Sequence, residues 1–239
     1  MIMFSPMYLL VIGAGMLLSM WASSRVKSAF AKYSRIRTRS GMTGAQVAQR
    51  ILQDNGIYDV KIERVPGQLS DHYDPRSKTL RLSEPVFGSD SMAAFGVAAH
   101  EVGHAIQHAQ GYAPLKFRSA WVPVASIGSR FSMIIIMAAF MLGAARSAAG
   151  SFGMLLAWIG LGLFAATTVF TLVTLPVEFD ASRRALISLE NGGYTTQEEV
   201  AGARKVLNAA AMTYVAAAAT SLMQLLYWAS LLLGGRSSD

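Results

Sequence analysis

Charged residues are missing from long stretches of this 239-residue chain. None occurs in Met1–Ser24, Ser147–Val177 or Val206–Gly235, and Phe131–Ala145 is a shorter charge-free run. A helix needs about 20 predominantly apolar residues to cross a bilayer, so the pattern predicts about four transmembrane helices. We place these helices at residues 5–21, 122–144, 152–175 and 207–233.

The polar segment 24–120 contains short stretches of helical and of alternating apolar residues, which are typical of a small α+β domain. Thr43 is a suitable cap for a helix that runs to Asp54, with Gln46 as its capping-box partner. Alternating apolar positions bounded by turn residues predict strands. The expected strands cover residues 60–65, 68–73 and 78–82, the last two as a hairpin.

Residues 91–110 are predicted to form a helix that is capped by Ser89 or Ser91 and ends before Gly111. This helix contains the sequence His100-Glu101-Val102-Gly103-His104, which uses two of the four histidines in the chain. Histidines at positions i and i+4 lie on one helical face, so both imidazoles can reach one zinc ion. The intervening Glu101 would project beside the metal, where a carboxylate can act as general base on zinc-bound water.

A third protein ligand must come from elsewhere in the chain. His108 lies eight residues after His100, about 12 Å away along the helix axis, and three histidines so spaced cannot easily converge on one ion. Two acids follow Pro176 at the end of the third predicted span, and both Glu178 and Asp180 remain candidates. His72 in the predicted hairpin would either face the site as a hydrogen-bond donor or be an exposed strand residue.

Composition and charge narrow the class of protein. The chain is 53% apolar and 15% charged, has a mean hydropathy of +0.37 and contains no cysteine, which excludes a soluble domain, a disordered chain and a disulfide scaffold. Fourteen Lys/Arg lie in 24–120 and four in 176–206, against Arg146 and Arg236 on the opposite side. The positive-inside rule places the two basic segments in the cytoplasm and both termini outside. Arg130 lies either inside the second span or, if that span begins later, at the membrane interface.

Three blocks of the sequence resemble the YugP-like small bacterial membrane zinc metallopeptidases, also called neutral zinc metallopeptidase family 2. The blocks are LSDHYDPRSKTLRLSEPVF, AAHEVGHAIQHAQGY and LPVEFDASRRAL. The family is distantly similar to HtpX-type and CAAX-prenyl membrane proteases of the gluzincin type. The resemblance implies one Zn²⁺ per chain, held by His100, His104 and Glu178, with Glu101 as catalytic base.

One position departs from the pattern of the distant relatives. They carry an aspartate four residues after the glutamate ligand, and here that position is Ser182. The supporting contact to a ligand would then come from Asp180, Arg183 or Arg184.

The expected fold is therefore a mostly α integral membrane protein with a small α+β cytoplasmic zinc domain at 24–120 and a second cytoplasmic segment at 176–206. The expected function is zinc-dependent endopeptidase activity at the cytoplasmic surface of a bacterial inner membrane. Substrates would be peptides or membrane proteins that pair with the hairpin edge at 68–82. The alternative is an inactive zinc-binding membrane scaffold or chaperone partner. No motif indicates nucleic-acid binding, and the spans lack the paired acids and symmetric repeats of a transporter.

Overall fold

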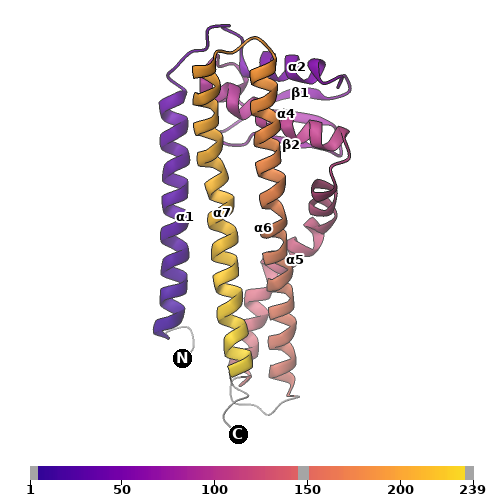
Figure 1. The fold of residues 1–239 in the computed structure, drawn as a ribbon. Helices are drawn as coiled ribbons and strands as arrows, with labels where there is room; N and C mark the ends of the chain where they lie inside the picture. The colour runs from indigo at the N-terminus through magenta and orange to yellow at the C-terminus, as the bar shows by residue number, and fades with distance from the viewer. Residues whose placement is uncertain (1–4, 145–150, 235–239) are drawn as a thin grey trace. The chain divides into compact units, whose positions relative to one another are not determined.

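The computed structural model describes residues 5–144 and 151–234. The described chain is mostly helical (Figure 1). It contains one three-stranded sheet. The elements in chain order are α1 (Pro6–Tyr33), α2 (Gly44–Asp54), β1 (Lys61–Val65), β2 (His72–Asp74), β3 (Thr79–Ser83), α3 (Glu84–Phe87), α4 (Met92–Ala109), α5 (Ala113–Met141), α6 (Phe152–Asn191) and α7 (Gln197–Gly234).

The chain divides into two compact units. The helical unit comprises residues 1–20, 117–175 and 214–239, and the mixed unit comprises residues 21–116 and 176–213. Four helices, α1, α5, α6 and α7, are long and apolar enough to cross a membrane. Each is longer than the span predicted for that part of the chain. For example, α1 continues to Tyr33 because neither glycine nor proline interrupts residues 22–33.

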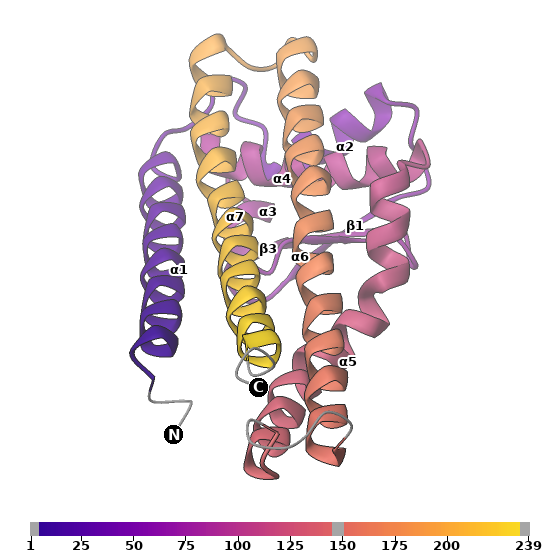
Figure 2. The same cartoon turned by 60° about the horizontal axis from the view of Figure 1, so that its bottom comes forward.

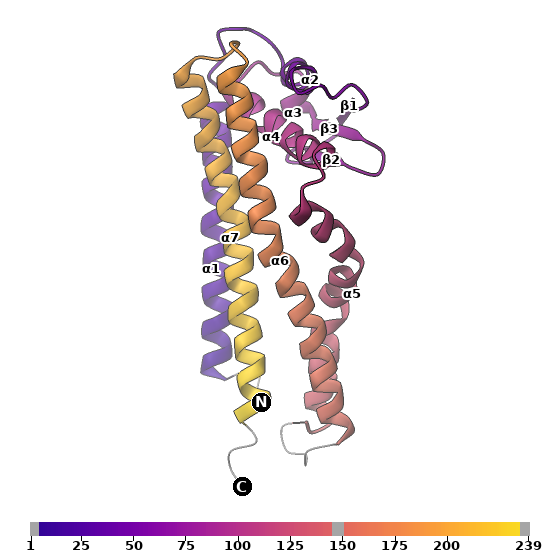
Figure 3. The same ribbon diagram turned by 45° about the vertical axis from the view of Figure 1, so that its right-hand side comes forward.

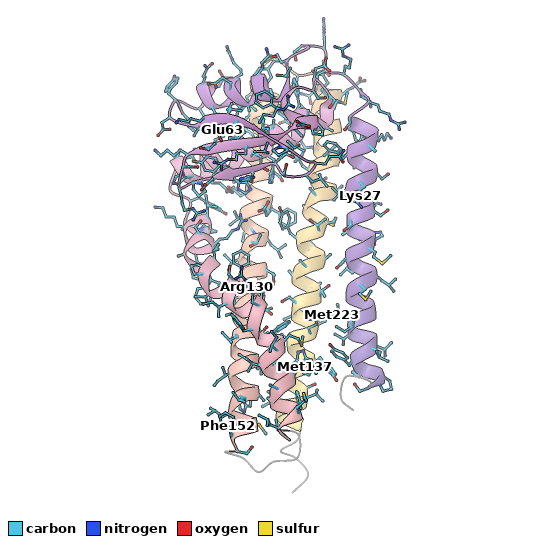
Figure 4. The ribbon with its side chains drawn as sticks, turned by 180° about the vertical axis from the view of Figure 1, so that it is seen from behind. Lys27, Glu63, Arg130, Met137, Phe152 and Met223 are labelled. Atoms are coloured by element: carbon cyan, nitrogen blue, oxygen red, sulfur yellow. The ribbon has the colours of Figure 1, made fainter. Side chains whose placement is uncertain are left out.

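The helical unit has its own apolar core. Ile136 of α5, Ala157 of α6 and Trp228 of α7 are buried together in it, and parts of α5 and α6 run side by side (Figure 3). Arg130 lies within α5 with an exposed side chain (Figure 4). Arg146 and Arg236, the two arginines expected on the side opposite the basic segments, lie outside the described residues.

The sheet of the mixed unit has the strand order β1-β3-β2, with β1 parallel and β2 antiparallel to β3. β3 is therefore the central strand and is paired on both sides. Of the hairpin expected to offer an edge at 68–82, only β2 lies at an edge of the sheet. β2 is also shorter than the strand expected at 68–73. Leu69 has a positive φ of 57°, and Asp71 accepts hydrogen bonds from the backbone and hydroxyl of Ser83 instead of joining the ladder.

Helices α2 and α4 lie close to this sheet (Figure 2). Thr43 caps α2 through a reciprocal capping box with Gln46, and Ser91 caps α4 by accepting a hydrogen bond from the backbone of Ala94. The buried face of α4 packs on α2, on β3 and on the parts of α6 and α7 that belong to this unit. The apolar core of the mixed unit includes Val47, Ile51, Leu80, Leu82, Phe95, Ala98, Val102, Leu189 and Ala203.

Candidate metal centre

Helix α4 presents His100 and His104 one turn apart, and α6 brings Glu178 to the same point. The Nε2 atom of His100 is 3.1 Å from Oε2 of Glu178, and Nε2 of His104 is 3.6 Å from the same oxygen. The two imidazole rings stand edge to face, 4.8 Å apart at their centres. One ligand atom from each of the three residues lies within 4.8 Å of the others. All three residues belong to the mixed unit.

Gly103 makes this meeting of helices possible. A Cβ atom at Gly103 would lie less than 3.0 Å from the backbone oxygen of Ala181, and 3.0 and 3.1 Å from its carbonyl carbon and Cα. The backbones of α4 and α6 therefore approach closely between the two histidines. Because Ala181 lies three residues after Glu178, about one helical turn, this approach presents Glu178 to the histidines.

His100 and His104 each have a hydrogen-bond partner at the Nδ1 atom. Nδ1 of His100 is 3.1 Å from the hydroxyl of Ser182, and Nδ1 of His104 is 3.0 Å from Oε1 of Gln107. Asp180 contacts neither ring, because its carboxylate accepts hydrogen bonds from Gln107, Arg183 and Arg184. Partners of this kind orient metal-binding imidazoles in known sites.

Glu101 is buried beside this group and is only 8% exposed. Burial raises the pKa of its carboxyl group to about 7, an effect that His100 opposes and that the nearby Glu178 and Asp71 reinforce. The backbone of Tyr73 on β2 is among the groups that lower this pKa. Edge strand β2 therefore passes directly beside this carboxylate.

His108 is engaged elsewhere. Its Nδ1 atom is 2.8 Å from the hydroxyl of Tyr73. Burial, with help from Asp59 and Asp74, raises the pKa of Tyr73 to about 12, so the phenol keeps its proton at neutral pH and can donate a hydrogen bond to Nδ1 of His108. A cavity of about 340 Å³ opens at this pair, between the loop 56–60, β2 and α4. His72 is exposed, with its Nδ1 atom 2.8 Å from the backbone oxygen of Ser70.

The structure thus brings His100, His104, Glu178 and Glu101 together and keeps His108 and Asp180 out of the cluster. Two imidazole nitrogens and one carboxylate oxygen form a donor set that catalytic zinc takes in proteins, with a further position left for water or substrate. The residues present therefore fit a zinc ion. Gln107 was missed by sequence reasoning, although its place three residues after His104, on the same helical face, was the available signal.

Four helices long and apolar enough to cross a membrane, and a His-His-Glu group beside a buried glutamate, are the features expected of a membrane zinc metallopeptidase. The chain belongs to the family described as "Putative neutral zinc metallopeptidase", whose sequence pattern matches residues 8–233. It is 45% identical over 222 residues to a Bacillus subtilis (strain 168) protein named "Putative membrane protease YugP", an alignment that covers 93% of this chain and 95% of that protein. No solved structure matches the chain.

Proposed function

We propose that this protein is a membrane-embedded zinc-dependent endopeptidase that hydrolyses peptide bonds at the cytoplasmic surface of the membrane. The observation that carries the proposal is the convergence of His100, His104 and Glu178 beside the buried Glu101. His100, His104 and Glu178 would hold one zinc ion per chain. Zinc bound there would act as a Lewis acid on a peptide carbonyl and would make a water molecule more acidic.

Glu101 acts as the general base and then as the general acid. A general base works best when its pKa lies near the working pH, and burial holds the pKa of Glu101 at about 7. Its carboxylate accepts a proton from the attacking water and returns it to the amine that leaves. A protein that only stored zinc would not need this carboxylate, which is the argument against the inactive scaffold.

The substrate chain is expected to bind beside β2. This strand is an edge of the sheet, and the backbone of Tyr73 on it lies near enough to Glu101 to lower its pKa. An extended peptide that adds to β2 would bring its backbone past the glutamate. The cavity at Tyr73 and His108 offers room for a side chain of that peptide.

The orientation rests on the Lys/Arg distribution of the sequence. The mixed unit contains the basic segments 24–120 and 176–206 almost entirely, so the positive-inside rule puts this unit, and with it the candidate site, in the cytoplasm. Substrates would then be membrane proteins, or peptides released at the membrane.

Metal analysis combined with a cleavage assay tests the function. Glu101→Gln keeps all three metal ligands, so the purified variant should retain zinc while hydrolysis falls by about 10²–10⁴-fold, the usual contribution of a general base. Glu178→Ala removes a ligand and should lose both zinc and activity. His108→Ala should keep its zinc, and Glu198→Gln, at an exposed acid on α7, serves as the neutral control. Full activity in Glu101→Gln would disprove the assigned role, and a zinc-loaded wild type that cleaves nothing in a peptide library would favour the scaffold.

A further inference from the structure

Gln107 is the most completely buried polar side chain near the candidate metal site. It is 0% exposed, and a buried amide needs partners for both its oxygen and its nitrogen. Its nitrogen, Nε2, is 2.8 Å from the backbone oxygen of Val177 and 2.9 Å from Oδ2 of Asp180. Its oxygen, Oε1, is 3.0 Å from Nδ1 of His104.

The hydrogen-bond partners of Gln107 determine the orientation of its amide group. A backbone carbonyl can only accept hydrogen bonds, and an ionised carboxylate likewise has no proton to donate. Two acceptors on one side of Gln107 therefore require its NH₂ group there. The carbonyl oxygen of Gln107 must then face His104, and because this oxygen can only accept, Nδ1 of His104 must carry the proton.

This assignment agrees with the other side of the imidazole ring. With the proton of a neutral ring on Nδ1, Nε2 of His104 has a lone pair and no hydrogen to donate. Its distance to Oε2 of Glu178 is 3.6 Å, beyond a normal hydrogen bond. His100 differs, because its Nε2 lies 3.1 Å from the same oxygen and its Nδ1 faces Ser182, whose hydroxyl can donate or accept.

Gln107 also ties the two ligand-bearing helices together. Val177 and Asp180 lie one residue before and two residues after Glu178 on α6. One side chain of α4 thus holds α6 on both sides of the glutamate while it orients the ring of His104.

We propose that Gln107 is a positioning residue that fixes His104 in its Nδ1–H tautomer, so that Nε2 is ready to bind the metal before the metal arrives. The inference rests on the proposed metal site but not on peptide cleavage. It assigns different tasks to the two histidines. Gln107 sets His104 in advance, whereas Ser182 can donate or accept and does not choose the tautomer of His100. In the zinc-free protein Nε2 of His100 instead donates to the carboxylate of Glu178.

The tautomer can be measured in the zinc-free protein. The chain has four histidines, so selective ¹⁵N labelling of histidine gives an NMR spectrum that is simple to assign with one His→Gln variant each. At alkaline pH, His104 of the wild type should show the proton on Nδ1. Gln107→Met, which removes the acceptor, should lose this preference, while Gln107→Glu keeps an acceptor and should retain it.

Zinc affinity supplies the second measurement, by competition with a chelator. Loss of such a supporting contact typically weakens metal binding by about 10–100-fold, so Gln107→Met should raise the zinc dissociation constant by that factor and Gln107→Glu by less. Gln110→Met, at the residue that follows the last one of this helix, removes a side-chain contact to Arg184 and should leave the constant unchanged. Nε2–H as the tautomer of His104 in the wild type, or equal losses of affinity in the Met and Glu variants with the tautomer preserved, would overturn the proposal. A wild type with the expected tautomer and zinc affinity but no peptidase activity would count against the proposed function alone.

Discussion

Replacement of Gly103 by alanine is the most informative single change in the candidate site. The added Cβ would lie less than 3.0 Å from the backbone oxygen of Ala181 and 3.0 Å from its carbonyl carbon, whereas carbon atoms in ordinary contact are about 3.5–4.0 Å apart. Helices α4 and α6 must therefore separate by on the order of 1 Å. Glu178 is carried on the same turn of α6 and would move away from the histidines by a similar distance.

The size of this displacement sets the expected effect. Zinc–ligand distances are held to within about ±0.2 Å, so a shift of about 1 Å should weaken zinc binding by at least the roughly 10-fold that the loss of a supporting contact causes. Overpacking also costs about 1–3 kcal/mol of folding free energy. Alanine regains about 1 kcal/mol over glycine in a helix interior, so the net loss of stability should be small and the loss of zinc large.

Gly96→Ala on the same helix is the matched control. It gains the same helix propensity, but its Cβ would lie 3.3 Å from its nearest neighbours in Ala203, a contact that needs only a slight adjustment. The assay is zinc competition with a chelator, with thermal unfolding in detergent to show that both variants fold. If Gly103→Ala binds zinc as tightly as Gly96→Ala, the close approach of α4 and α6 does not position Glu178, and the reasoning fails.

Three other predictions concern the base, the topology and the substrate. The raised pKa of Glu101, about 7 against an ordinary 4.5, means that the zinc-free fold loses stability as pH rises between these values. Glu101→Gln should therefore be more stable than wild type by up to about 3 kcal/mol at pH 8 and equal to it near pH 4, and equal unfolding temperatures at pH 8 would contradict the pKa assignment. Cysteines introduced at the exposed positions Ser77 and Asn191 should resist an impermeant thiol reagent in intact cells, whereas one at Ser237, which lies outside the described residues, should react; labelling at Ser77 would place the site outside the cell. Peptides N-methylated at single positions should show loss of cleavage at alternate residues if they pair with β2, and uniform tolerance would show that substrate docks differently.

Local patterns were the most predictable part of this molecule. The Thr43 capping box, a serine cap at Ser89 or Ser91 and the apolar runs follow from contacts within a few residues, so they can be read from the sequence. The structure shows that the cap is Ser91. The sheet order could not be predicted in the same way, because the parallel pairing of β1 with β3 depends on the crossover between them. That pairing makes β3 central and leaves β2 as the edge beside Glu101.

The candidate site also combines residues that local spacing predicts with residues that depend on distant contacts. His100 and His104 follow from helical spacing, but spacing alone left Glu178 and Asp180 as alternatives. The structure separates these two acids by direction on α6: Glu178 faces the imidazoles, and Asp180 faces Gln107 and two arginines. The role of Gln107 depends on residues about 70 positions further along the chain, and no local pattern reports such a contact.

The other edge of the small sheet has a consequence for how copies of this protein behave beside one another. β1 exposes Lys61, Glu63 and Arg64, and Figure 4 labels Glu63 on it. Glu63 pairs with Arg81 at 3.3 Å, and Arg64 pairs with Glu84. Charged side chains on an edge strand discourage edge-to-edge association of sheets. Of the two edge strands of the sheet, β1 is therefore protected by its charges. Valines in place of Lys61 and Glu63 would turn it into an unguarded template on which neighbouring molecules could aggregate.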